Sequence, residues 1–392
     1  MNSSKIIEQI SVAEFCYATV FLGFVAYQTL VYSGIIPNLL GGSFTFFLIL
    51  TFPFLLFKEI KQWKDKIALK FIRRLWFLFL VIFALYLAYG FFVEVNPLIL
   101  FSNVLALIRF FVMYFIFKNI NTSSKIIRGV SIVVLLVVFL LVLLSPGLVH
   151  TDVLEFEENS LFATDSFQVD YQTMGALVLI ASFIASDSSS YIGRLVIFII
   201  ALLSLLGCGA RFELIAFIVC IGIRELKLLG GAKFFIHFLV LTVLGTLIYF
   251  LVYMSKGGVI DLKQGIRIFQ LIEDGSINDR LYLFYEATHV IRDNFLFGDY
   301  ANYNPGAYAH NIISAWVDTG FVGFFALSLI YFSSIYLFCK NYLIKRRVYK
   351  SFAFLMIVAS FMAASFSKHY TNIYLPIMVG AIVAHFSNRK HV

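Results

Sequence analysis

Residues 75–93 read LWFLFLVIFALYLAYGFFV, a run without a single charged side chain. A transmembrane helix needs about 20 consecutive, mostly apolar residues to cross the hydrocarbon core of a bilayer. Similar runs recur along the chain of 392 residues, of which 61% are hydrophobic and only 13% are charged. Soluble domains have about 45–50% apolar and about 25% charged residues. The composition therefore predicts a polytopic membrane protein and excludes a water-soluble globule, a disordered chain and a nucleic-acid-binding domain.

The apolar runs predict one all-α integral membrane domain over residues 1–392, a transmembrane helical bundle of about twelve spans. The first run has no small-residue cleavage site, so we expect it to be retained as a span rather than removed as a signal peptide. The four cysteines are far apart and form no C-x-x-C motif, which supports neither a disulfide framework nor a zinc site. The expected spans cover about residues 11–32, 38–57, 75–93, 98–117, 129–148, 170–187, 193–209, 211–223, 234–254, 312–338, 351–367 and 373–387.

Basic residues gather in alternate connections between these spans, beginning with the stretch from Lys58 to Arg74. Loops rich in lysine and arginine remain in the cytoplasm, so this pattern predicts that both termini are cytoplasmic. The cations that fall on the opposite, outer side are few: Lys256, Lys263, Arg267, Arg280, Arg292 and Lys368.

The connection over residues 255–311 is the longest, and we expect it to form a large extracytoplasmic loop containing short amphipathic helices. Long loops in compact proteins usually carry function. The segment 280–298, RLYLFYEATHVIRDNFLFG, predicts a helix on the outer membrane surface that ends at Gly298. Its apolar side is formed by residues three or four positions apart: Leu281, Phe284, Tyr285, Thr288 and Ile291.

Two arginines and a histidine at the outer ends of the expected helices are candidates for chemistry. Arg211 follows a tight glycine-containing reversal in GARFELIAF (209–217). Arg280 opens the loop helix, and arginine presents a planar fork of donors that matches phosphate oxygens. His310 stands beside Asn311 in GAYAHNIISAWVDTGFVGFF (306–325), and an imidazole with a near-neutral pKa suits proton transfer.

Each candidate also has an ordinary structural explanation. Arg211 equally suits contact with lipid headgroups or pairing with Glu213. Arg267 and Arg292 suit binding to anionic headgroups, and His310 alone suits an interfacial hydrogen bond. Arg109, in the middle of an expected span, has no assigned role. The acidic run over residues 155–158 is interpreted as a solvated loop, and no D-x-D motif points to a metal site.

In their order along the chain, these motifs resemble the O-antigen polymerase and O-antigen ligase superfamily of bacterial envelope glycosyltransferases. The resemblance covers about residues 200–325 and the overall topology. It includes the arginine of GARFELIAF and the segment from Arg280 through Ala287 to Gly298. It also includes His310-Asn311, followed by Asp318-Thr319-Gly320 and Gly323, where the two glycines are expected to let another helix approach closely.

The resemblance implies a metal-independent, inverting glycosyl transfer without a cofactor, in which a polyprenyl diphosphate is the leaving group. Arg211 and Arg280 match arginines that hold the diphosphate, and His310 matches the essential histidine of the family. The implied location is the bacterial inner membrane, with a periplasmic active site. Further substrate contacts are expected from the loop cations, Asn311 and sugar-stacking tyrosines: Arg267, Arg292, Asn311, Tyr303 and Tyr308.

Three functions remain open at this point. The first is a polymerase that joins undecaprenyl-diphosphate-linked oligosaccharides, with membrane lipids, a chain-length regulator and a flippase as partners. The second is an O-antigen ligase, which has the same donor but a lipid A–core acceptor. The third is a transporter or flippase, which predicts charges at mid-depth and two related halves. The sequence shows no internal repeat and one clear mid-span charge, Arg109, which disfavours the transporter. We favour the polymerase over the ligase because the chain is short, rich in Phe, Ile and Tyr, and only loosely patterned outside the motif residues.

Overall fold

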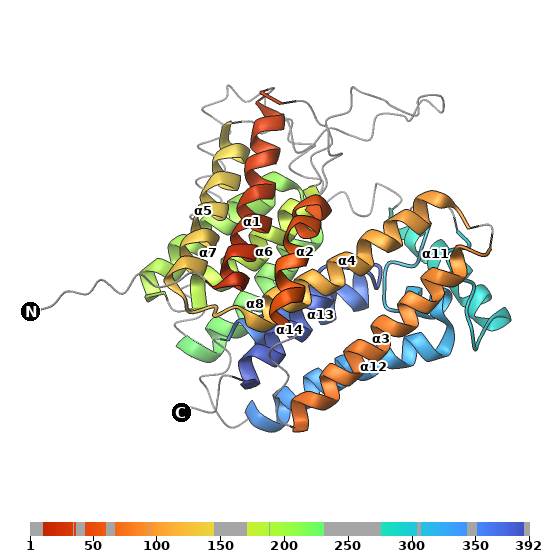
Figure 1. The fold of residues 1–392 in the computed structure, drawn as a ribbon. Helices are drawn as coiled ribbons and strands as arrows, with labels where there is room; N and C mark the ends of the chain where they lie inside the picture. The colour runs from red at the N-terminus through yellow and green to blue at the C-terminus, as the bar shows by residue number, and fades with distance from the viewer. Residues whose placement is uncertain are drawn as a thin grey trace, which may run out of the picture.

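A computed structural model describes residues 11–33, 35–36, 44–59, 67–93, 95–144, 171–187, 189–230, 276–303, 307–342 and 351–387. Within these ranges every regular element is an α-helix (Figure 1). Six of these helices have segments long and apolar enough to cross a membrane, which agrees with the composition. The protein is therefore an α-helical protein embedded in a membrane.

All expected spans except 234–254 overlap a helix that the structure describes. The expected span 234–254 and the loop residues 255–275 lie outside the described residues, so the number of spans and the extent of the loop stay predictions. The helices are α1 (Val12–Tyr32), α2 (Phe44–Glu59), α3 (Ile67–Gly90), α4 (Pro97–Asn119), α5 (Lys125–Leu144), α6 (Tyr171–Asp187), α7 (Tyr191–Cys208), α8 (Arg211–Leu229), α11 (Ser276–Asp293), α12 (Ile313–Tyr342), α13 (Phe352–Phe366) and α14 (Tyr374–Ser387).

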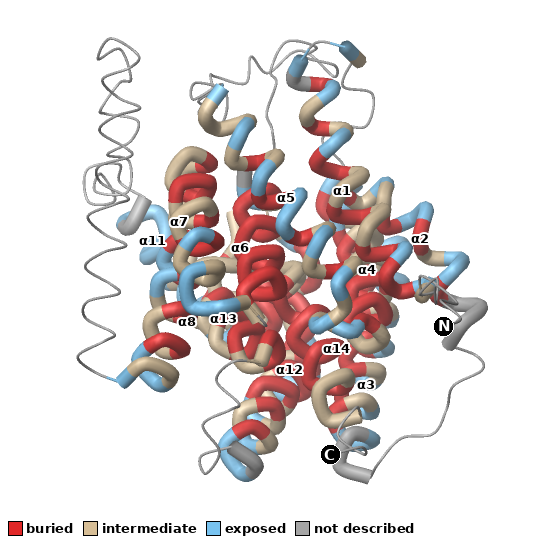
Figure 2. Tube along the Cα trace, turned by 90° about the vertical axis from the view of Figure 1, so that its left-hand side faces the viewer, coloured by how far each residue is buried: buried red, intermediate tan, exposed pale blue. Residues whose placement is uncertain are grey.

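The centre of the bundle is formed by helices that are apolar on all sides, chiefly α6 and α14 (Figure 2). A helix without a polar face is buried by its neighbours. Helix α14 lies against α4 so closely that a side chain at Gly380 would meet the Tyr114 carbonyl. The outer helices instead expose large apolar side chains such as Leu85 and Leu144, as a lipid-facing surface requires.

One end of the bundle, here called the basic end, joins the ends of α6, α7 and α8 through charged side chains. Arg194 at the start of α7 donates from Nε and Nη2 to the Glu225 carboxylate, at 3.2 Å in each case. Arg224 donates to Glu225 Oε1 at 3.2 Å and to Ser186 Oγ at 2.9 Å. The start of α7 and the end of α8, which the sequence predicts on one side of the membrane, therefore lie together.

The other end, here called the site end, collects the connections α3–α4, α7–α8, α11–α12 and α13–α14. Because α13 and α14 are short, the chain between them lies deep in the bundle. Arg109, near the middle of α4, donates from Nη2 to the Thr371 carbonyl at 3.1 Å. With a rise of about 1.5 Å per residue, this contact lies about 18 Å along α4 from its first residue. Irregular backbone at such depth is tolerated only inside protein or beside a water-filled cavity.

Helix α12 is kinked at Gly320, and the segment after α11 packs into the kink. Gly320 has φ 60° and ψ −168°, a conformation that is essentially restricted to glycine. The Phe321 N–H donates to the Phe295 carbonyl at 3.0 Å, and the Asp299 N–H donates to the Val317 carbonyl at 2.7 Å. These two hydrogen bonds replace those that the kink removes from the helix.

Two details of the sequence prediction need correction here. The neighbour at Gly320 is the loop backbone of Leu296 rather than another helix, and a side chain at Gly323 would collide with Thr319 of the same helix. The helix that begins near Arg280 exists as α11, but it ends at Asp293 instead of Gly298. The chain leaves the helix early because residues 295–299 bind α12, and Gly298 takes a left-handed φ of 69° within that contact.

Candidate functional site

His310 lies in the α11–α12 connection, half-buried at the site end. The Tyr308 ring lies 4.7 Å from the His310 ring, and also 4.7 Å from the ring of His369. Burial, the positive charge of Arg280 and then the nearby His369 and Lys368 lower the pKa of His310 to about 4, although a hydrogen bond with the Ser367 backbone opposes this. His310 is therefore a neutral imidazole at neutral pH.

Lys368, in the α13–α14 connection, is a cation held by two polar neighbours. Its Nζ lies 3.1 Å from Glu213 Oε1 and donates to Gln172 Oε1 at 3.0 Å. Glu213 is 1% exposed and also accepts a hydrogen bond from the Tyr374 hydroxyl at 3.0 Å. The pair joins the first turns of α6 and α8 to the α13–α14 connection, so the lysine has a defined position.

Asp318, in the first half of α12, contacts His369 and the segment around Ala301 and Tyr303. Its buried carboxylate lies 3.6 Å from His369 Nε2 and accepts hydrogen bonds from the Ala301 N–H and the Tyr303 hydroxyl, at 3.2 Å and 3.4 Å. Ala301 has a φ of 56°, which is strained for a residue with a side chain. The bond to Asp318 helps to hold this conformation. Burial and the Asp318 charge raise the pKa of Tyr303, so its hydroxyl remains a donor.

Helix α11 presents Arg280 on the side that faces His310. Ala287, seven residues later and so on the same face, is 5% exposed and packs toward the bundle. Arg280 itself is exposed, and its charge acts on His310. Arg292 lies on a different face, is exposed, and forms no ion pair with any residue that the structure describes.

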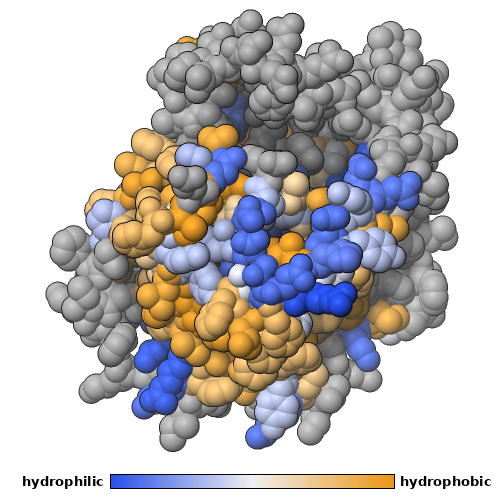
Figure 3. Space-filling model, turned by 90° about the vertical axis from the view of Figure 1, so that its right-hand side faces the viewer, coloured by the Kyte–Doolittle hydropathy of each residue, from blue (hydrophilic) through white to orange (hydrophobic). Residues whose placement is uncertain are grey.

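The site end thus brings together four of the predicted residues: His310, Arg280, Tyr303 and Tyr308. Arg211 is the first residue of α8, two positions before Glu213, whose carboxylate pairs with Lys368 and Tyr374. Its role at the site stays a prediction. On this side of the molecule, hydrophilic side chains gather above a hydrophobic region (Figure 3).

Asn311 has a clear structural task. Its Oδ1 accepts a hydrogen bond from the Ile313 N–H at 2.9 Å and so caps the first turn of α12. Its role in substrate binding stays a prediction, and Arg267 lies outside the described residues.

Lys368 and His369 were not predicted as site residues. They lie in SKHYTN (367–372), between two short apolar runs. Adjacent titratable side chains between such runs are a usable signal, because charges near the membrane interior are costly and usually functional. The partners of these residues, Glu213 and Asp318, were known from the sequence only as members of motifs.

No group of three or more histidine, cysteine, aspartate or glutamate side chains suited to a metal ion occurs among the residues that the structure describes. No protein-family model matches the chain, and no curated protein matches it either.

Proposed function

We propose that this protein is a membrane glycosyltransferase that removes a saccharide from a polyprenyl diphosphate carrier and joins it to an acceptor hydroxyl. In the form we favour, it polymerises lipid-linked repeat units of a bacterial surface polysaccharide. The proposal places the site end at the periplasmic face of the inner membrane and both termini in the cytoplasm, in agreement with the basic connections.

The observation that carries the proposal is the packing of His310 against Tyr308, whose ring also contacts His369, with the cations Arg280 and Lys368 nearby. The pKa of His310 is about 4, lowered by burial and by the charge of Arg280, with Lys368 and His369 also contributing. Such an arrangement suits a reaction in which an anionic group binds beside a proton acceptor. A diphosphate offsets the cations when it binds, which raises the pKa of His310 and makes the imidazole a stronger base.

The bond changes follow from this arrangement. The acceptor oxygen attacks the anomeric carbon as its proton passes to His310, and the bond from that carbon to the diphosphate oxygen breaks with its electron pair on the diphosphate. Arg280, Arg211 and Lys368 stabilise the negative charge that grows on the leaving group. Attack opposite the leaving group inverts the configuration of the carbon.

The site end suits a substrate with a lipid tail. Arg109, near the middle of α4, donates to the Thr371 carbonyl of the α13–α14 connection, so this connection packs inside the helical bundle. In the proposal, the diphosphate binds beside Lys368 while the tail of its carrier stays in the bilayer. Arg109 also has a structural partner, so its position in a span does not by itself favour a transporter.

Deletion of the gene, followed by reconstitution, tests the proposal. Cells without the protein should accumulate single repeat units on polyprenyl diphosphate, and the purified protein in liposomes should convert that lipid into a ladder of longer chains. Liposomes without the protein are the control, and absence of any glycosyl transfer contradicts the proposal. Loss of the ladder with single-unit lipopolysaccharide retained supports a polymerase, whereas loss of all capped lipopolysaccharide supports a ligase.

A further inference from the structure

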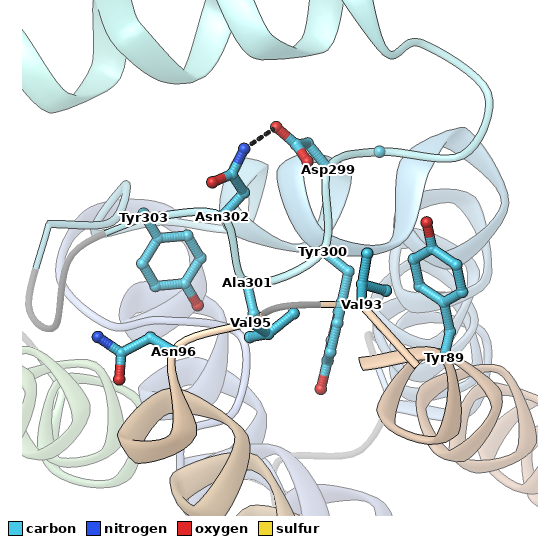
Figure 4. A pocket seen from close by; sticks show the side chains of 10 residues that line it. Tyr89, Val93, Val95, Asn96, Asp299, Tyr300, Ala301, Asn302 and Tyr303 are labelled. Carbon is cyan, nitrogen blue, oxygen red and sulfur yellow. Dashed lines mark hydrogen bonds between the residues drawn. The ribbon is translucent and has the colours of Figure 1, made fainter. Parts of the chain in front are cut away.

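A cavity of about 600 Å³ lies beside the site, between the α3–α4 connection and the start of the segment that leads from α11 to α12 (Figure 4). Its volume falls within the range of about 300–1,000 Å³ that is usual for small-molecule sites. The lining residues are Tyr89, Val93, Val95, Asn96, Gly298, Asp299, Tyr300, Ala301, Asn302 and Tyr303.

The described lining combines aromatic rings with hydrogen-bonding groups and contains no lysine or arginine. Asn96 uses its Oδ1 to cap α4 through the Leu98 N–H, which leaves its Nδ2 as a donor. Asn302 donates to Asp299 Oδ2 at 2.8 Å, which leaves its amide oxygen and the second Asp299 oxygen as acceptors (Figure 4). The cavity therefore offers donors, acceptors and ring faces, but no positive charge.

One wall of the cavity is held rigidly. Tyr300 is 4% exposed, and its hydroxyl accepts a hydrogen bond from Asn103 Nδ2 at 2.9 Å. The next residue, Ala301, is held in its left-handed conformation by Asp318. A wall that is already ordered binds a ligand with less loss of conformational entropy.

Tyr303 connects the cavity to the cluster around His310. Its ring lines the cavity, while its hydroxyl donates to Asp318 Oδ2 at 3.4 Å. The same ring lies 6.3 Å from the ring of Tyr308 and 6.4 Å from that of His369. A ligand in the cavity is therefore separated from the histidine cluster by one side chain.

We propose that this cavity is a saccharide subsite, which binds uncharged sugar residues of a substrate while the cations hold the diphosphate elsewhere. Sugars present hydroxyls that both donate and accept hydrogen bonds, and C–H faces that pack on aromatic rings. A phosphate group does not fit the described lining, in which Asp299 supplies a carboxylate and no lysine or arginine is present, and a lipid tail does not fit its polar groups. The inference rests on the proposed function for the origin of the sugar.

A binding experiment with the free saccharide tests the subsite separately from catalysis. The probe is the oligosaccharide released by mild acid from the lipid that accumulates in the deletion strain, and calorimetry with the purified full-length protein measures its dissociation constant. Tyr89→Ala and Asn302→Ala should each weaken binding about tenfold, because each removes one contact group. Both residues lie at the exposed rim, so these variants should fold.

Phe92→Ala is the matched control, because Phe92 is 90% exposed on the same connection and does not line the cavity. This variant should bind the oligosaccharide as the unmodified protein does. Absence of binding by the unmodified protein, or binding by both cavity variants that is as tight as that of the unmodified protein, overturns the subsite even if the lipid-linked substrate is still turned over. If no lipid-linked saccharide accumulates in the deletion strain, this result contradicts the proposed function itself, independently of the binding measurements.

A kinetic measurement identifies which substrate provides the sugar. The free oligosaccharide can serve as an acceptor but not as a donor, because it has no diphosphate. If the cavity variants raise the KM for the free oligosaccharide about tenfold and leave the KM for the lipid-linked donor unchanged, the subsite belongs to the acceptor. The reverse pattern assigns it to the donor, and unchanged values for both overturn the subsite.

Discussion

The basic end and the site end of the bundle both hold ionisable side chains inside the protein, but in different surroundings. At the basic end, Arg194, Arg224 and Glu225 lie on regular helices, and Arg224 is 1% exposed. At the site end, Lys368 and His369 lie on an irregular connection, and a cavity lies beside their cluster.

This difference distinguishes charges that stabilise the fold from charges that are available for chemistry. At the basic end, Arg194 and Arg224 share the buried Glu225 carboxylate between regular helices, which suits a role in holding these helices together. A half-buried histidine with a shifted pKa, among cations on non-helical backbone, has the features of a functional site. The two ends should therefore respond oppositely to substitution, since changes at the basic end affect folding and changes at the site end affect activity.

The largest effect should come from His310→Ala. Loss of the proton acceptor should lower the rate of glycosyl transfer by a factor of about 10²–10⁴, while the protein level and binding of the lipid-linked donor are retained. Gel analysis of polymer length measures the outcome. Normal polymer length in this variant would mean that His310 is not the proton acceptor. It would also contradict the view that the site end carries the catalytic function.

The converse test is Glu225→Gln at the basic end. Removing one partner of a buried ion pair usually costs about 3–5 kcal/mol, so the variant should unfold far more readily in detergent than the unmodified protein. The KM of the molecules that remain folded should not change. Glu213→Gln, the matched change at the site end, should cost less stability because Lys368 is 16% exposed and keeps Gln172, but it should impair transfer. Equal stability losses would contradict the distinction.

Arg280→Lys tests whether Arg280 binds the diphosphate. Lysine keeps the charge but loses the planar fork of donors, so transfer should fall by about 10- to 100-fold, equivalent to about 1.5–3 kcal/mol. Arg292→Lys on the other face of α11 is the control and should retain activity. Full activity of the Arg280 variant would mean that a point charge is sufficient or that the arginine does not bind the diphosphate.

Gly320→Ala tests the kink that forms part of the site end. An alanine there has a disfavoured φ and collides with the Leu296 carbonyl, so we expect a loss of about 1–3 kcal/mol in stability. Gly222→Ala is the control, since a side chain at Gly222 in α8 meets nothing within 4 Å. Thermal unfolding in detergent measures the stability of both variants. Equal unfolding temperatures for Gly320→Ala and Gly222→Ala would contradict the kinked conformation at Gly320.

The smallest effect should be the pH dependence of the unmodified protein. Because the pKa of His310 is about 4, the base is neutral from about pH 5 upward, and kcat/KM should be flat to pH 8. Below about pH 4, kcat/KM should fall about tenfold per pH unit as the imidazole is protonated. The acidic fall in kcat should occur at a pH at least about one unit higher than the fall in kcat/KM, because bound diphosphate raises the pKa of His310. A limb in kcat/KM near pH 6.5 would contradict the cationic surroundings.

Parts of the site end could be predicted because they lie in recognisable local sequence. His310 and Arg280 were found from residue type and spacing, and Gly209 from the reversal that it permits. The pairing of Lys368 with Glu213 could not be found in this way, because the two residues are far apart in the sequence and meet only when α6, α8 and the α13–α14 connection pack together. The early end of α11 was missed for a similar reason, since its cause is the distant backbone of α12.

The sequence alone determined the class of protein, the approximate position of the helices and the grouping of basic connections at one end. These properties depend on hydrophobicity and charge, which act residue by residue along the chain. The tertiary structure decided which connections lie deep in the bundle, where α12 is kinked and which charges face one another. These properties depend on how the helices pack, and packing brings together groups whose separation in the sequence carries no information about their distance in space.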